Sequence, residues 1–155
     1  MRSDTPQFKP FDQSLHDIHD HATKEKVARW IRWWDNCEVR EGSKYGVDLE
    51  CYRGSELYSL VEVESRSFGG RCTYDTIHVP YRKVKFYRSD VLTFLFAVDF
   101  EGHWGYIAPL LSVVLSPLKE VKNKYMAERE YFYDVPIKKF YEIEINTPPY
   151  WRKNG

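Results

Sequence analysis

The chain has 155 residues, of which 43% are hydrophobic and 30% are charged, so a folded domain with a sizeable core is expected and a disordered chain is excluded. The formal net charge is zero, which argues against a protein that coats nucleic acid but is compatible with an enzyme carrying a local basic surface. No apolar run approaches transmembrane length and the first residues contain no apolar signal segment, so we expect an intracellular, cytoplasmic protein without membrane attachment.

The first predicted element is a helix over residues 14–35. Four apolar residues recur there at helical spacing and form a stripe that should face the core: Val27, Trp30, Ile31 and Trp34. The charged residues of the same segment, Lys24 among them, are expected to point mostly to water. Residues 1–13 contain two prolines and are expected to form an irregular arm.

After residue 36 the apolar pattern changes to a period of two, which is typical of strands. Strands are expected at 37–41, 46–53, 57–66, 76–80, 83–88, 92–100 and 104–108. The nearly continuous apolar run from Val91 to Phe100 predicts a central strand that is buried on both faces.

The remaining segments are predicted less regularly. They are a short strand or helical turn at 110–115, an exposed helix at 118–130, a loosely alternating segment at 132–145 and an irregular tail at 146–155. A helix followed by largely antiparallel strands predicts a single α+β domain over residues 1–155. The three cysteines, Cys37, Cys51 and Cys72, lack zinc-ligand spacing and are expected to be free thiols.

An acidic cluster is the feature that points to chemistry. Asp48 lies in the strand predicted at 46–53, while Glu62 and Glu64 lie two residues apart in the next one, so the period of two places both on one face. A short connection between the strands lets Asp48 approach the same face. Three carboxylates close together repel one another, and a hard divalent cation, Mg²⁺ or Mn²⁺, is their natural partner. An open, solvated acidic face is the alternative.

These residues resemble the motif of the PD-(D/E)xK superfamily, which contains restriction enzymes, Holliday-junction resolvases and related nucleases. The resemblance covers roughly residues 14–100: a leading helix, a short strand, the run G-V-D-x-E and a hydrophobic strand that ends in E-V-E. It implies a restriction-endonuclease-like core, with the N-terminal helix packed on a mixed, largely antiparallel sheet. It also implies a metal-dependent endonuclease that hydrolyses DNA, with structure-specific or resolvase-like activity among the options, and a homodimer.

The resemblance further implies roles for single residues. Asp48 and Glu62 would bind the metal, with the backbone carbonyl of Val63 as a third ligand. Glu64 would orient or activate the attacking water, although most family members have lysine at this position. Asp20 on the leading helix would be a further acid near the metal.

A basic stretch from Tyr81 to Lys85 follows the acidic strands. Lys83 or Arg82 is expected to stabilise charge at the scissile phosphate and to supply the cation that position 64 lacks. Lys85 and Arg66 are further candidates for contact with nucleic acid. The alternative for this stretch is a solvated edge strand whose lysines deter aggregation.

Two functions therefore follow from the sequence. The first is a Mg²⁺- or Mn²⁺-dependent deoxyribonuclease, of a size that fits a phage or mobile-element nuclease. The second is a non-catalytic α+β module that binds protein or nucleic acid, with the acidic face solvated. Stabilisation by Mn²⁺ that depends on Asp48 would distinguish the two.

Overall fold

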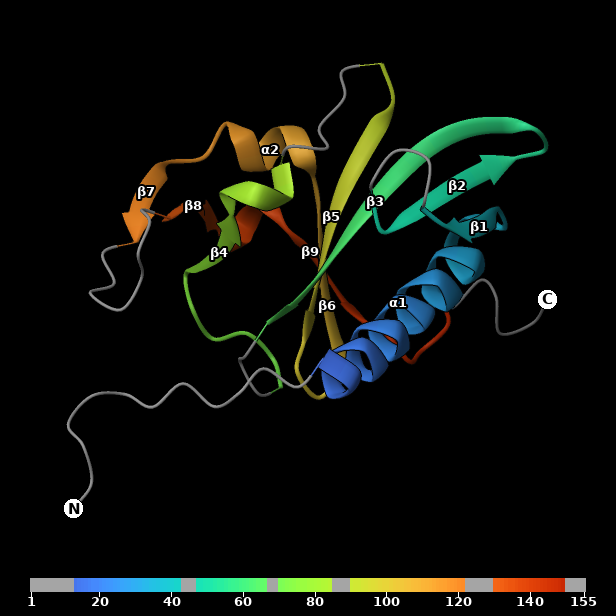
Figure 1. The fold of residues 1–155 in the computed structure, drawn as a ribbon, viewed down its shortest axis with the longest axis horizontal. Helices are drawn as coiled ribbons and strands as arrows, with labels where there is room; N and C mark the ends of the chain where they lie inside the picture. Colours follow the sequence, from blue (N-terminus) through green and yellow to red (C-terminus); the bar gives the residue numbers. More distant parts are fainter. Residues whose placement is uncertain (1–12, 43–46, 67–69, 85–89, 122–129, 150–155) are drawn as a thin grey trace.

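A six-stranded mixed sheet lies between a long helix on one face and a smaller three-stranded sheet on the other (Figure 1). The computed structural model describes residues 13–42, 47–66, 70–84, 90–121 and 130–149, with side chains described for all of these except residues 13–19 and 121. The helices are α1 (Gln13–Asp35) and α2 (Leu110–Val114), with 3-10 turns η1 (Tyr81–Val84) and η2 (Ile137–Lys139). The strands are β1 (Glu38–Glu41), β2 (Leu49–Arg53), β3 (Glu56–Arg66), β4 (Thr76–Pro80), β5 (Leu92–Asp99), β6 (Trp104–Pro109), β7 (Leu118–Val121), β8 (Glu130–Pro136) and β9 (Tyr141–Glu144).

The large sheet has the order β1-β2-β3-β5-β6-β9, and the small sheet has the order β4-β8-β7. All pairs are antiparallel except β3 and β5, which run parallel from Ser59↔Leu92 to Arg66↔Asp99. The expectation of an α+β fold with an N-terminal helix on a mixed, mostly antiparallel sheet is therefore confirmed.

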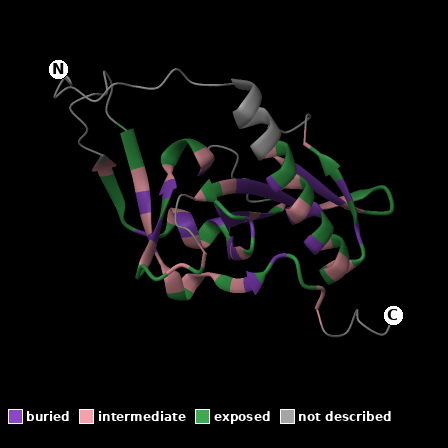
Figure 2. Cartoon of the chain, turned by 90° about the horizontal axis from the view of Figure 1, so that it is seen from below, coloured by how far each residue is buried: buried purple, intermediate pink, exposed green. Residues whose placement is uncertain are grey.

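The two faces of the large sheet carry separate apolar cores. Val61 and Val63 of β3 and Phe96 of β5 face α1, where Val27 and Trp30 pack against them. Alternate residues of β5 face the small sheet and α2 instead, so β5 is buried on both sides, as the apolar run predicted. Figure 2 shows the buried residues concentrated in these central strands and on the inner side of α1.

The predicted first helix is confirmed to within one residue. The predicted hairpin is also confirmed, although β2 begins at Leu49, three residues later than expected. Trp34 departs from the expected core stripe, since it stacks on Trp30 at 5.2 Å between ring centroids but remains 42% exposed. The three cysteines are free thiols.

Two local predictions were wrong. The helix expected at 118–130 begins as strand β7, because Leu118–Val121 pairs with β8, and such tertiary pairing overrides local propensity; residues 122–129 lie outside the described part. Residues 83 and 84, the start of the strand expected at 83–88, belong to the 3-10 turn η1 instead. Pro80 ends β4 there, since proline lacks the N–H that would extend the ladder, and 85–89 are not described.

Candidate active site

The site lies at the start of β2, beyond which β3 continues with β5 as its partner strand. The β2–β3 ladder runs from Arg53↔Glu56 to Leu49↔Val61, whereas β3 continues to Arg66. Beyond Val61, the β2-facing side of the β3 backbone is therefore free of ladder partners among the described residues. Side chains occupy this opening, and Glu62 and Glu64 project from β3 on the face away from α1.

Asp48 fills the opening from the β2 side. It lies immediately before β2, and its Oδ2 accepts a hydrogen bond from the backbone N–H of Val63 at 2.8 Å. The Asp48 side chain thus replaces the ladder bond that β2 no longer supplies. This contact holds Asp48 beside Glu62, as the alternation of the sequence predicted.

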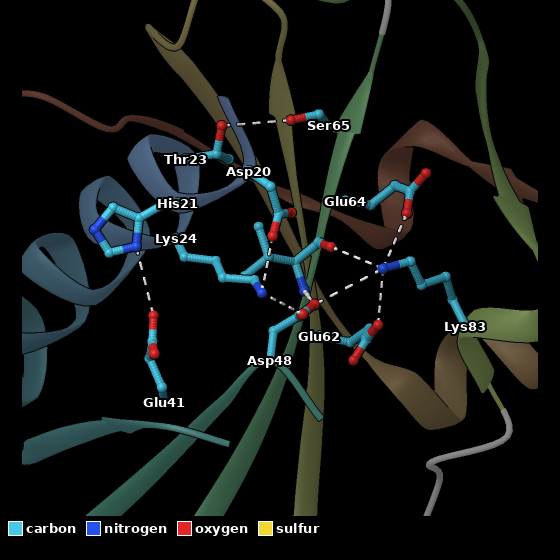
Figure 3. Close-up of polar contacts among 11 residues, drawn as sticks. Asp20, His21, Thr23, Lys24, Glu41, Asp48, Glu62, Glu64, Ser65 and Lys83 are labelled. Carbon is cyan, nitrogen blue, oxygen red and sulfur yellow. Dashed lines mark hydrogen bonds and ion pairs between the residues drawn. The ribbon is translucent and has the colours of Figure 1, made fainter. Parts of the chain in front are cut away.

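Lys83 enters from the opposite side, carried by η1. Its Nζ donates to Glu62 Oε1 at 2.8 Å and to the Val63 carbonyl at 3.2 Å, and lies 3.5 Å from Glu64 Oε2 and 3.7 Å from Asp48 Oδ2 (Figure 3). The predicted site residues Asp48, Glu62, Glu64 and Lys83, together with the carbonyl of Val63, therefore meet at one point. Lys83 is 15% exposed, so it does not belong to a solvated edge strand.

Burial dominates the electrostatics of this cluster. It raises the pKa of Glu62 to about 7, against the lowering effect of the Lys83 ammonium. Burial also lowers the pKa of Lys83, but the carboxylates of Glu62, Asp48 and Glu64 outweigh it, so the net pKa of Lys83 is raised. Lys83 therefore carries its positive charge at neutral pH.

The carboxylates are not solvated, contrary to the alternative drawn from the sequence. The exposed fraction of the side chain is 3% for Glu62, 11% for Glu64 and 17% for Asp48. Buried carboxylates require compensation, because an unpaired charge away from water is costly. The compensation here comes from lysine and arginine side chains.

Lys24 of α1 is a second cation in the site. Its Nζ lies 3.2 Å from Asp48 Oδ1 and 2.9 Å from Asp20 Oδ2, between the two acids in Figure 3. Burial lowers the pKa of Lys24, but the combined effect of the Asp20 and Asp48 carboxylates is larger and of opposite sign, so the net pKa is raised. Asp20, the expected helix acid, does lie near the site, and Lys24 stands between it and Asp48.

Arg66 is the third cation, 3.5 Å from Glu64 Oε1. Four carboxylates (Asp20, Asp48, Glu62, Glu64) and three cations (Lys24, Arg66, Lys83) are thus linked by ion pairs. When all are ionised, the cluster has one negative charge in excess, which favours a further cation.

The chemistry of the donors fits a divalent cation. Carboxylate oxygens and the Val63 carbonyl are hard ligands of the kind that Mg²⁺ and Mn²⁺ take. Glu62 Oε2 is buried and has no hydrogen-bond partner among the described residues. In the described part of the chain, however, no three acidic, imidazole or thiolate groups are grouped closely enough to hold a metal ion. Lys83 Nζ occupies the point where these donors converge, so a divalent cation held there would have to displace the ammonium.

Of the remaining predicted residues, the structure describes Arg82, which is not brought into the cluster. Arg82 is exposed on η1, and Lys85 lies outside the described residues.

The sequence reasoning missed two residues. Lys24 was expected to point to water, although its spacing of four residues from Asp20 would have indicated a helix ion pair. Glu50 was not singled out, yet it is 4% exposed and lies on the same side of β2 as Asp48. Its Oε1 accepts a hydrogen bond from the Tyr52 hydroxyl at 2.8 Å, and strand alternation with Asp48 was the signal for its position.

Comparison with known proteins does not assign the chain to a family. No protein-family model, curated protein or solved structure matches the chain. No helix in the described ranges is long and apolar enough to cross a membrane. The resemblance to PD-(D/E)xK nucleases therefore depends on the motif residues of the sequence.

Proposed function

We propose that this protein is a metal-dependent endonuclease that hydrolyses DNA phosphodiester bonds. The observation that supports the proposal is the meeting of Asp48, Glu62, Glu64, the Val63 carbonyl and Lys83 at the opening between β2 and β3. The acids come in the order of the motif, with Asp48 directly before β2 and with Glu62 and Glu64 on the adjacent strand β3. Buried oxygen donors, with one negative charge in excess when all are ionised, are suited to a divalent cation that in turn binds a phosphate.

In this proposal Asp48, Glu62 and the Val63 carbonyl hold Mg²⁺ or Mn²⁺. The ion, when bound, supplies Lewis-acid activation of water and neutralises charge on the phosphate. The N–H of Val63 and the ammonium of Lys24 fix the two oxygens of Asp48, so this carboxylate is held in one orientation. Such preorganisation is what a catalytic site needs from the groups around it.

Most family members have a lysine at the last motif position, and in this protein Glu64 and Lys83 together take the role of that lysine. Glu64 accepts a hydrogen bond from the attacking water and orients it. Lys83 moves from the carboxylates toward the scissile phosphate and stabilises the negative charge that develops there. Lys83 already lies 3.5 Å from Glu64, so the cation missing from position 64 reaches the site from η1.

The test is cleavage of labelled linear duplex, single-stranded and four-way-junction DNA in Mg²⁺ and in Mn²⁺. Wild type should cut at least one of them, and Asp48→Asn and Glu62→Gln should lower the rate at least a hundredfold. Glu144→Gln, which removes an exposed carboxylate on β9, is the matched control and should cut like wild type. Equal rates in all four proteins would overturn the assignment.

A second candidate function is a non-catalytic module that binds protein or nucleic acid, and one observation favours it. Lys83 Nζ already pairs with all three carboxylates, and such an ion-pair network serves structure without a metal. This function predicts no cleavage and no stabilisation by Mn²⁺, whereas a nuclease site predicts a Mn²⁺-dependent rise in melting temperature that Asp48→Asn abolishes.

A further inference from the structure

A groove of about 670 Å³ runs along the side of α1 that faces β1 and the start of β2. Its basic lining residues come from both elements: Lys24, Lys26, Arg29 and Arg32 from α1, and Arg40 from β1. Two glutamates, Glu25 and Glu41, also line it, with His21 within ion-pair distance of both. Basic side chains outnumber acidic ones by five to two, although the chain as a whole is neutral.

Three of these cations contact neutral oxygens rather than carboxylates. Arg32 donates to the Val39 carbonyl at 3.2 Å, Arg29 to Asn146 Oδ1 at 2.6 Å and Lys26 to the Gly102 carbonyl at 3.4 Å. No salt bridge joins any of them to a carboxylate within the described ranges. Their charge therefore remains available to an anionic partner, unlike that of Lys83 or Arg66.

The groove also borders the candidate active site. Lys24 lines it and lies 3.2 Å from Asp48 Oδ1, so one side chain belongs to both. From Lys24 to Arg32 the helix rises by about 12 Å at 1.5 Å per residue. With one phosphate per roughly 3.4 Å of axis on each strand of a duplex, this length accommodates about three or four phosphates.

We propose that this α1–β1 groove binds the sugar–phosphate backbone of the DNA strand and guides it to Asp48. The inference rests on the proposed nuclease function but names a different surface from the basic stretch at 81–85. Lysine and arginine side chains bind phosphates without reading bases, so the groove positions the strand and does not select its sequence. Arg29 and Arg32 are the residues whose removal tests it, because both are exposed.

The experiment measures DNA binding by fluorescence anisotropy in EDTA, where no cleavage occurs, at several salt concentrations. The double variant Arg29→Gln/Arg32→Gln should bind more weakly, and the slope of log K against log salt should become shallower by about 1.4–1.8, or roughly 0.7–0.9 per lost phosphate contact. The matched control Lys119→Gln/Lys138→Gln removes two exposed charges on the far side of the large sheet and should leave the slope unchanged. Arg29→Lys/Arg32→Lys should retain the slope of wild type.

Two results would overturn the groove assignment. One is an equal change of slope in the groove variant and the control, which would indicate only the loss of overall charge. The other is equally tight binding of a poly-glutamate of matched length through Arg29 and Arg32, which would indicate an acidic protein partner. Cleavage by wild type is scored separately, so a nuclease that binds DNA elsewhere is distinguished from a protein that is no nuclease.

Discussion

Replacement of Lys83 by methionine tests the electrostatic description of the site. Methionine keeps most of the length of the side chain and removes the ammonium, which lies 2.8, 3.5 and 3.7 Å from oxygens of Glu62, Glu64 and Asp48. At an effective dielectric constant of about 20, each of these attractions amounts to roughly 5 kcal/mol. Desolvation of the buried charges offsets most of this. Removal of one partner from a buried ion pair costs about 3–5 kcal/mol, because the other charge is left uncompensated.

Urea denaturation followed by tryptophan fluorescence at pH 8, where Glu62 is largely ionised, should show this loss in the free energy of unfolding. At pH 5.5 the loss should be smaller, because a protonated Glu62 no longer needs the ammonium. Excess Mn²⁺ should stabilise Lys83→Met more than wild type, since the point where the oxygen donors converge is then open to it. Lys119→Met is the control: Lys119 is 56% exposed and pairs with Asp134 at 2.7 Å, so its loss should cost about 1 kcal/mol or less. Equal losses in the two variants would refute the reasoning.

Three further predictions follow from other parts of the structure. Because burial raises the pKa of Glu62 from 4.5 to about 7, the folded state binds this proton more tightly, and its stability falls as pH rises through that window. The side chain of the Glu62→Gln variant does not titrate. As pH rises from 4.5 to 8, its free energy of unfolding, measured by urea denaturation, should therefore increase by up to about 3 kcal/mol relative to wild type. A difference that stays constant with pH would contradict the raised pKa. Gly105→Ala should lower the free energy of unfolding by about 1–3 kcal/mol in thermal denaturation, because the added Cβ would lie 2.6 Å from Phe96 Cε1. An unchanged melting temperature would show that Phe96 moves aside without loss of stability. Asp99→Ala should cost about 3 kcal/mol by urea denaturation, because the carboxylate accepts three backbone N–H groups of the β5–β6 turn; a loss below 1 kcal/mol would show that water replaces it.

The parts of the site that could be predicted from sequence are those fixed by local periodicity. The period of two placed Glu62 and Glu64 on one face of β3, and a short hairpin brought Asp48 to the same face. The long apolar run likewise identified β5 as a central strand. In each case a simple repeat determines the direction of the side chains.

Contacts between distant segments were harder to predict. Lys83 was a candidate on charge alone, but its contact with Glu62 depends on the 3-10 turn after Pro80, which no periodic signal marks. Lys24 was expected to face solvent, because its position on the helix does not reveal that Asp48, just before β2, lies next to it in the fold. The charged residues of β7 were read as helix because the partner strand, β8, lies later in the chain.

The most direct test of the central claim is Mn²⁺ binding measured by electron paramagnetic resonance, in which free Mn²⁺ gives a six-line signal that is lost on binding. Wild type should bind about one Mn²⁺ per chain, Asp48→Asn and Glu62→Gln should bind at least tenfold more weakly, and Glu144→Gln should match wild type. No binding by wild type, or equal binding by all four proteins, would contradict a metal site at Asp48 and Glu62.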